Sequence, residues 1–230
     1  MKDWLAVAWI ALWMPVHTAS LWLRDAQYYR HWTLLRVDLA MARAYWWRDP
    51  YFLARREGAG IDVPPETLTY GTTPWATAAA LLRAVEAKAG ERFLELGAGQ
   101  GRMAFFARIH AGLTVDAYEL LPTFVRVADT IRQHLRVDRV TFHQANLLTA
   151  DLTHTDIVYL AGTCLDDATL GALETKLAWL KPGARVISLS FPLEAPGLEI
   201  IGQVPIAVSW GNSTAYLHRM AVRSESAQPE

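Results

Sequence analysis

The sequence predicts an α/β fold: a doubly wound, seven-stranded sheet with a C-terminal antiparallel hairpin, preceded by an N-terminal helical, membrane-associating extension. Three observations predict it. Strand-like and helix-like segments alternate from residue 92 to residue 190, which is typical of βαβ units and a parallel sheet. Two strand-like segments around a short turn follow and predict the hairpin. Seven of the ten tryptophans lie in the first 50 residues, ahead of this pattern.

The elements of the domain are expected in a regular order. A helix begins with Thr73 as its N-cap and Pro74 at its first position, and runs to Lys88, where Gly90 stops it. Strands are predicted at residues 92–96, 113–120, 140–145, 156–161 and 184–190, and helices at 100–110, 122–135 and 166–180. The hairpin is formed by residues 197–208 and 213–220 around the turn 209–212, and its second strand is expected to run antiparallel in the sheet.

The first hydrophobic segment, residues 4–23, contains no Asp, Glu, Lys or Arg. As a helix it would be roughly 30 Å long, the thickness of a bilayer core, and transmembrane helices tolerate a proline such as Pro15. We favour a membrane anchor, because the seven arginines between Arg24 and Arg56 would hold its C-terminal side in the cytoplasm. A buried helix of a soluble protein is the alternative. A cleaved signal peptide is disfavoured, because residues 1–3 have no net positive side-chain charge.

A second helical segment, residues 26–47, alternates bulky apolar residues with arginines. It suits a helix in the plane of the lipid headgroups and, equally, a helix packed on the domain. The chain therefore divides into a hydrophobic and amphipathic helical extension (residues 1–56), a linker (57–65), a domain (66–222) and a disordered tail (223–230).

Charge and cysteine content exclude several classes of protein. The chain has 22 basic and 23 acidic residues, so its overall charge predicts no nucleic-acid partner. The single cysteine, Cys164, excludes an internal disulfide and a cysteine-built zinc site, and no metal is expected.

A glycine-rich loop, residues 95–101 (ELGAGQG), connects the first predicted strand of the domain to the next helix. Glycines at such a point let the backbone approach a ligand closely. No Gly-Lys-Ser/Thr follows, which excludes a nucleoside triphosphate loop, and Arg102 takes the place of the third glycine of a dinucleotide fingerprint. Glu95, at the tip of the strand, suits a cationic ligand and repels a pyrophosphate.

This loop resembles the first motif of the class I S-adenosylmethionine-dependent methyltransferases, Asp/Glu-x-Gly-x-Gly-x-Gly. Glu119, 18 residues after Gly101, matches the family's acidic residue that accepts both ribose hydroxyls. Asn146 stands where the family usually has an Asp that contacts the adenine amino group. The resemblance covers roughly residues 66–220 and implies S-adenosylmethionine as the cofactor. The cofactor-binding residues that it implies are Glu95, Gly97, Ala98, Gly99, Gly101, Glu119, Leu120, Asn146 and Leu147.

Two further segments, residues 69–75 (TYGTTPW) and 210–217 (WGNSTAYL), are similar to one subgroup. It contains the small membrane-anchored protein-lysine methyltransferases of the ATP synthase c-subunit lysine methyltransferase type and their prokaryotic relatives. The loop at residues 161–165 (AGTCL), which faces the methyl group in this fold, departs from the subgroup's leucine- and proline-rich sequence. The candidate residues on the substrate side are Tyr70, Thr73, Trp75, Ala161, Gly162, Thr163 and Trp210.

The leading functional hypothesis is a membrane-associated methyltransferase, with its catalytic domain on the cytoplasmic side, that methylates a lysine of a membrane or membrane-proximal protein. Burial and aromatic walls that lower the pKa of the amine can suffice without a dedicated base, so no catalytic residue is assigned. Two alternatives stay open. One is methylation of an apolar small molecule such as a quinone, tetrapyrrole or lipid, and the other is a non-catalytic assembly subunit of a membrane complex.

Overall fold

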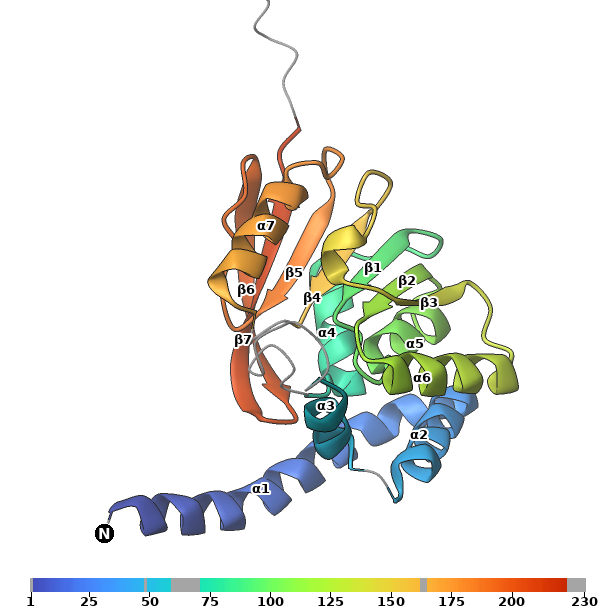
Figure 1. The fold of residues 1–230 in the computed structure, drawn as a ribbon, viewed down its shortest axis with the longest axis vertical. Helices are drawn as coiled ribbons and strands as arrows, with labels where there is room; N and C mark the ends of the chain where they lie inside the picture. Colours follow the sequence, from blue (N-terminus) through green and yellow to red (C-terminus); the bar gives the residue numbers. More distant parts are fainter. Residues whose placement is uncertain (1, 48, 59–70, 162–164, 223–230) are drawn as a thin grey trace, which may run out of the picture.

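The computed structural model describes residues 2–47, 49–58, 71–161 and 165–222, and for residues 2–12 and 51 it describes the backbone alone (Figure 1). Most of the predicted linker and all of the predicted disordered tail lie outside the described residues. The described chain forms one seven-stranded sheet with the order β3-β2-β1-β4-β5-β7-β6. The predicted sheet is therefore confirmed.

The first five strands are parallel, and the last two form the antiparallel hairpin. The turn of the hairpin consists of residues 209–210 and is shorter than the predicted turn 209–212, because the last strand already begins at Gly211. The strands are β1 (Arg92–Leu96), β2 (Thr114–Glu119), β3 (Val140–Gln144), β4 (Ile157–Leu160), β5 (Arg185–Leu189), β6 (Leu198–Val208) and β7 (Gly211–Met220).

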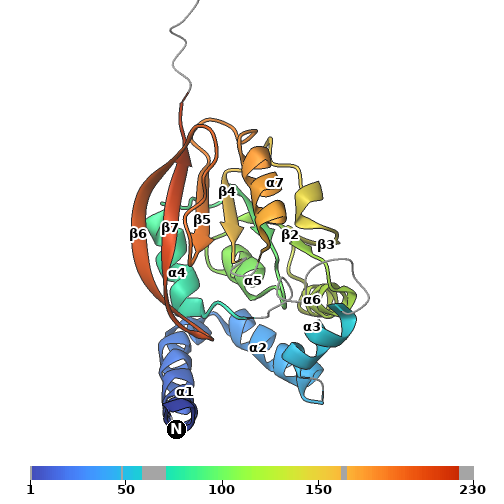
Figure 2. The same ribbon diagram turned by 60° about the vertical axis from the view of Figure 1, so that its left-hand side comes forward.

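Helices cover both faces of the sheet, as a doubly wound fold requires (Figure 2). Alternate residues of β1 enter two different cores: Phe93 packs with α4, α5 and α6, and Leu94 packs with α7. Glu95 lies two residues after Phe93 on the strand, so its side chain points to the same face of the sheet, toward the first of these cores. The helices of the domain are α4 (Trp75–Ala84), α5 (Arg102–Ile109), α6 (Pro122–Leu135) and α7 (Asp167–Leu177), with the short turn η3 (Leu147–Thr149).

Helix α4 differs from its prediction at both ends. Its N-cap is Pro74 rather than Thr73, and neither residue caps the helix with its side chain. The acceptor comes instead from a distant part of the chain, since Asp25 Oδ1 accepts from the Ala76 N–H at 2.9 Å. The helix ends at Ala84, four residues before the predicted end at Lys88.

The N-terminal extension consists of α1 (Lys2–Ala26), η1 (Gln27–Arg30), α2 (Trp32–Tyr45) and α3 (Pro50–Gly58). These helices lie below the sheet in Figure 1, and the first part of α1 projects beyond the body of the molecule. Among the described residues, no helix is long and apolar enough to cross a membrane, so the predicted transmembrane span is not found. The polar residues His17, Thr18 and Ser20 reduce the mean hydropathy of α1.

The second half of α1 is packed on the domain. His17 is buried, and its Nε2 lies 2.8 Å from the Val208 carbonyl oxygen at the end of β6. His17 also stacks on Trp13, while Leu21 and Asp25 continue the buried stripe at intervals of four residues. This half of α1 is thus part of the folded body.

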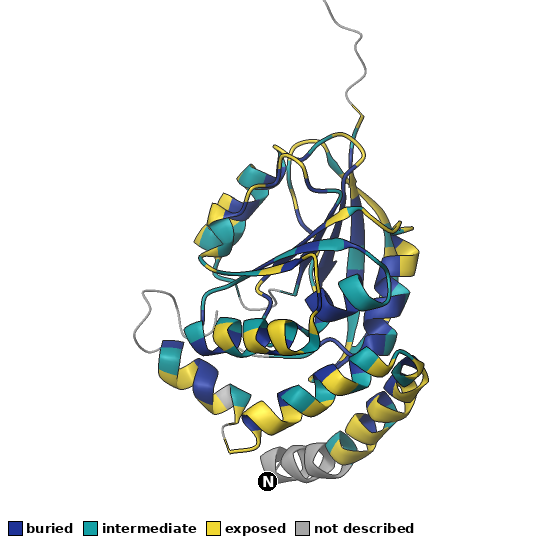
Figure 3. Cartoon of the chain, turned by 90° about the vertical axis from the view of Figure 1, so that its right-hand side faces the viewer, coloured by how far each residue is buried: buried dark blue, intermediate teal, exposed yellow. Residues whose placement is uncertain are grey.

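One face of α2 is packed on the domain as well (Figure 3). Leu34, Val37, Met41 and Tyr45 are buried and join the core formed by α4, α5 and α6. The opposite face of α2 is exposed. Of the two placements that the sequence left open, packing on the domain accounts for this buried face.

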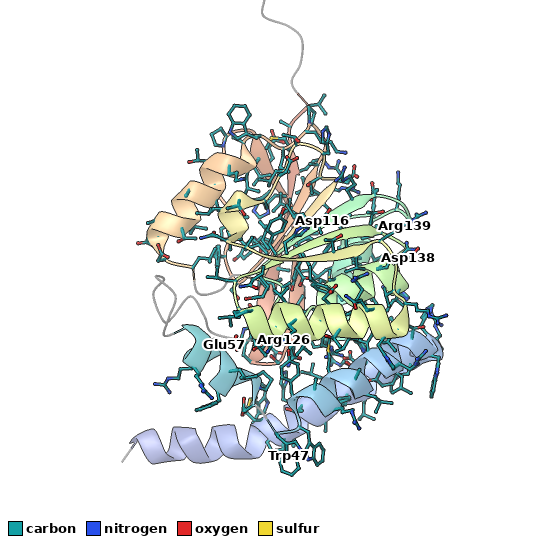
Figure 4. All side chains as sticks on the ribbon, turned by 45° about the vertical axis from the view of Figure 1, so that its right-hand side comes forward. Trp47, Glu57, Asp116, Arg126, Asp138 and Arg139 are labelled. Carbon is teal, nitrogen blue, oxygen red and sulfur yellow. The ribbon has the colours of Figure 1, made fainter. Side chains whose placement is uncertain are left out.

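The last helix of the extension, α3, caps a helix of the domain. The Glu57 carboxylate accepts from the backbone N–H of Thr123 at 3.1 Å and from the Thr123 hydroxyl, at the N-terminal end of α6. Arg126, one turn further along, donates to the same hydroxyl at 2.9 Å. Figure 4 shows Glu57 and Arg126 together at this end of α6. Carboxylates at helix N-termini satisfy free N–H groups and the helix dipole.

Candidate cofactor site

The glycine loop after β1 has a backbone conformation that favours glycine. Gly97, Gly99 and Gly101 all have positive φ, of 81°, 53° and 80°. A Cβ at Gly101 would lie 2.6 Å from the Phe142 ring, so a larger residue fits neither the backbone nor the space there. The N–H groups of Gly97 and Ala98 both donate to the Tyr118 carbonyl oxygen at 2.9 Å, which holds the loop against the end of β2.

Glu119, at the C-terminal end of β2, lies directly beside this loop. Its Oε2 accepts from the Gly99 N–H at 2.7 Å and its Oε1 from the Leu121 N–H at 2.8 Å. Burial raises the pKa of Glu119, and the backbone hydrogen bonds act in the opposite direction. Each carboxylate oxygen has a second lone pair, so the group can accept two further hydrogen bonds. The motif and the acid, 18 residues apart in the sequence, are therefore brought together.

Glu95 is buried under the loop. Its Oε2 atom has no hydrogen-bond partner among the described residues. Burial raises the pKa of this carboxyl well above its usual range. A buried carboxyl oxygen without a partner is costly, unless a ligand supplies a donor or a positive charge.

Glu95 opens into a pocket at the C-terminal ends of β1 and β4. Its empty space, counting the part open to solvent, is about 290 Å³. The lining residues come from the segment before α4, from the glycine loop and from β4: Gly71, Thr72, Thr73, Glu95, Gly97, Ala98, Gln100, Arg102, Met103, Tyr159 and Ala161. Ligands of open α/β sheets bind at this end of the strands.

The remaining predicted cofactor residues lie along the ends of β2 and β3. Leu120 is half-buried after Glu119, and Leu147 is half-buried in η3. Asn146 is exposed, and its Oδ1 accepts from the Leu148 N–H at 2.9 Å, so it caps η3. The predicted contact of Asn146 with an adenine amino group stays a prediction.

The predicted substrate-side residues differ in where they lie relative to the pocket. Thr73 and Ala161 line the pocket. Trp210 packs on the pocket residue Gly71 so closely that a Cβ there would lie 2.3 Å from the indole ring. Trp75 does not form a wall of the pocket, because its side chain is fully buried and stacks on Phe106. The others, Tyr70, Gly162 and Thr163, lie outside the described residues.

Sequence reasoning missed Tyr159, in the middle of β4. Its hydroxyl lies 2.5 Å from the Thr73 Oγ1, and both residues line the pocket. Burial raises the pKa of the Tyr159 hydroxyl well above its usual value, so it stays protonated at neutral pH. A tyrosine within an apolar strand gives no local signal, since such residues are common in the cores of sheets.

Sequence reasoning also missed the role of Arg102, the first residue of α5. Its guanidinium lies 3.2 Å from Asp25 and 3.0 Å from Asp38, and 3.9 Å above the centre of the Trp75 ring. Asp38 also accepts from the Tyr29 hydroxyl at 2.7 Å and from the Trp75 indole N–H at 2.8 Å. Burial raises the pKa of Asp38, although the Arg102 charge opposes this. The extension and the glycine loop therefore meet in one buried polar network.

The sheet order, the glycine loop and Glu119 define a Rossmann-like domain with the class I S-adenosylmethionine-dependent methyltransferase fold. Solved structures share this fold. An RNA methyltransferase from Salinibacter ruber, in complex with S-adenosyl-L-homocysteine, matches with a TM-score of 0.57 and 24% identity, covering 69% of this chain and 99% of that one. TrmN from Thermus thermophilus matches with a TM-score of 0.54 and 20% identity, covering 68% of this chain and 52% of that one.

The fold alone does not determine the reaction. The [4+2]-cyclase SpnF also matches, with a TM-score of 0.54 and 12% identity, covering 64% of this chain and 81% of that one. No protein-family model and no curated protein matches the chain. The residues of the site therefore determine which reaction the domain supports.

Proposed function

We propose that the chain binds S-adenosylmethionine and transfers its methyl group to a lysine side chain of a protein. The observation that carries the proposal is the arrangement of three features: the glycine loop lines the pocket, Glu119 is hydrogen-bonded to that loop, and the Glu95 Oε2 atom, without a partner among the described residues, lies at the same pocket. The bound cofactor would supply an electrophilic methyl carbon on a positively charged sulfur. Glu119 would accept the ribose hydroxyls, and Glu95 would face a positive charge of the cofactor.

Charges around the pocket favour a cationic acceptor. Arg102, which lines the pocket, is paired with Asp25 and Asp38 behind it, and Glu95 lines the same pocket. Even with Glu95 protonated, the two aspartates exceed the single positive charge. A lysine side chain approaching such a site is attracted, and its proton is lost more easily once the ammonium is desolvated between the pocket walls. Thr73 and Tyr159 offer neutral hydroxyl groups to the nitrogen.

Transfer of the methyl group requires an in-line geometry but no covalent enzyme intermediate. The lysine nitrogen forms a bond to the methyl carbon as the bond from that carbon to sulfur breaks, and the amine proton leaves to solvent before attack. The contribution of the chain is to hold the two reactants and to exclude water.

The cofactor part of the proposal is tested by calorimetric titration of S-adenosylmethionine. Glu119→Ala removes a bidentate acceptor, and we expect binding to weaken by at least about tenfold, since a charged hydrogen bond contributes about 1.5–3 kcal/mol. Glu199→Ala, an exposed carboxylate on β6, is the matched control and should leave the Kd unchanged. Absence of binding by the wild-type chain would refute the proposal and favour a non-catalytic assembly subunit.

The acceptor is tested by incubating native membranes with the enzyme and methyl-labelled cofactor. Label should appear in a protein, and mass spectrometry should place it on a lysine. The Glu119→Ala variant should give no label above background. Label confined to the lipid extract would indicate an apolar small-molecule acceptor instead, and label in nucleic acid would equally contradict a lysine.

A further inference from the structure

The outer face of the extension is apolar where solvent-exposed faces are ordinarily polar. Along α2 and its C-cap residue Trp46, large apolar residues recur every seven positions: Trp32, Leu39 and Trp46 lie within about 40° of one another around the helix axis. Trp47, the next residue, and Phe52 on α3 are exposed large apolar residues as well. We call these five residues the outer face. Trp46 is 73% exposed and Trp47 is 89% exposed, so neither is covered by the chain itself.

The buried residues of α2 lie on the opposite side of the same helix. Leu34, Val37, Met41 and Tyr45 already supply the packing on the domain. The outer face is therefore not needed to hold α2 in place. Figure 4 shows Trp47 at the outer limit of the molecule, on the far side of α2 from the sheet. An exposed patch of this kind marks an interaction site.

Charges show which partner fits this surface. Six arginines of the extension are exposed: Arg24, Arg30, Arg36, Arg43, Arg55 and Arg56. Three acidic residues point the other way, since Asp25 and Asp38 are turned inward to Arg102 and Glu57 is turned toward Thr123, while Asp49 is exposed. Folding thus separates the charges of the extension. The net charge of its exposed residues is more positive than the net charge of the whole segment.

We propose that the outer face binds an anionic lipid surface, with α2 and α3 lying along it and no helix crossing it. Tryptophan rings prefer the boundary between headgroups and acyl chains, and arginines pair with anionic headgroups. On α2, Arg36 and Arg43 lie four residues after Trp32 and Leu39, so they flank the apolar stripe on one side. This alternation of ring and guanidinium is that of an interfacial helix.

Docking in this way would bring the pocket close to the lipid. The inner side of the extension contacts Arg102, which lines the pocket, so about one helix diameter, ~10 Å, separates the outer face from the site. Lipid binding does not depend on methyl transfer. A chain that binds vesicles but not the cofactor would refute only the proposed function.

Sedimentation of the full chain with vesicles tests the proposal, using phosphatidylcholine alone and phosphatidylcholine mixed with phosphatidylglycerol. We expect binding to the anionic vesicles, weakening as salt is raised. Arg36→Glu with Arg43→Glu should weaken it by more than about twentyfold, because each basic residue near the surface contributes about fivefold. Lys88→Glu with Arg219→Glu, exposed positions in the domain, makes the same change of net charge and should have little effect.

Apolar contacts are tested separately. Trp46→Ala with Trp47→Ala should weaken vesicle binding by about tenfold or more. Trp179→Ala is the matched control, because this tryptophan, after α7, is also 73% exposed but lies outside the extension. An unchanged circular dichroism spectrum would show that each variant folds. Equal losses in all variants, no binding of the wild type, or a tryptophan pair that changes only self-association would overturn the proposal.

Discussion

Arg102 is the residue at which the cofactor loop and the extension meet. It follows Gly101 directly and contacts two aspartates of the extension with one guanidinium. The guanidinium lies largely buried beside two carboxylates and the Trp75 ring, so its removal leaves Asp25 and Asp38 buried without a counter-charge. Arg102 stands where a dinucleotide site would have its third glycine. In the structure this arginine pairs with Asp25 and Asp38, which a glycine could not do.

We expect Arg102→Ala to lower the free energy of unfolding by about 3–5 kcal/mol, the usual cost of breaking a buried ion pair. Arg102→Lys should lose less, because the charge stays while the contacts of the planar group with Asp38 and Trp75 are lost. Urea unfolding measures both. Arg108→Ala is the matched control on the same helix. Its pair with Asp138 lies at the surface and is expected to contribute at most about 1 kcal/mol. An equal loss in both alanine variants would contradict this account.

At the scale of helices and strands, the local sequence predicted which elements exist and their order better than it predicted the residues at which they begin and end. The alternation of residues 92–190 predicted the parallel sheet, and the two strand-like segments at 197–208 and 213–220 predicted the hairpin, because apolar strands and turns are local patterns. The N-cap of α4 was assigned to Thr73. The acceptor at this end of the helix is instead Asp25, which lies 51 residues before its donor, the Ala76 N–H. Contacts such as those of Asp25, Glu57 and Tyr159 depend on tertiary packing, and no local pattern indicates them.

Strand β7, between β5 and the edge strand β6, contains a histidine whose protonation state is determined by its neighbours. His218 of β7 is fully buried, and its Nε2 accepts from the Leu193 N–H at 3.1 Å. Its Nδ1 must then carry the proton and donate to the Val186 carbonyl oxygen, 3.3 Å away on β5. Burial lowers the pKa of His218 below its usual range. The neutral ring thus connects β5, β7 and the chain after β5.

This arrangement predicts a loss of stability in mild acid. Because the folded state takes up the His218 proton less readily than the unfolded state, the free energy of unfolding should fall as the pH drops below about 6.5. His218→Gln should make this slope shallower in chemical unfolding measured between about pH 5 and 7.5. His134→Gln, an exposed position on α6, is the control. A slope that is unaltered by His218→Gln would show that other groups carry the dependence.

At the scale of the whole molecule, the extension is part of the domain rather than an appendage to it. Its carboxylates reach the beginnings of three helices around the site: Asp25 at α4, Asp38 with Arg102 at α5, and Glu57 at α6. Its apolar residues share one core with those helices. The sequence predicted the extension from composition, but composition cannot distinguish a helix that faces lipid from one that covers a domain.

Two truncations distinguish an integral extension from a detachable anchor. Removal of residues 1–58 should leave a chain that unfolds or aggregates, because it uncovers the core partners of Leu34, Val37, Met41 and Tyr45. Large buried apolar side chains contribute about 1.5–3 kcal/mol each, and their sum is comparable to a typical net stability of about 5–15 kcal/mol. Removal of residues 1–12 spares Trp13 and the buried stripe, so the melting temperature should change by less than about 4 °C. A cooperative melt of the longer truncation near the wild-type temperature would instead support a detachable anchor.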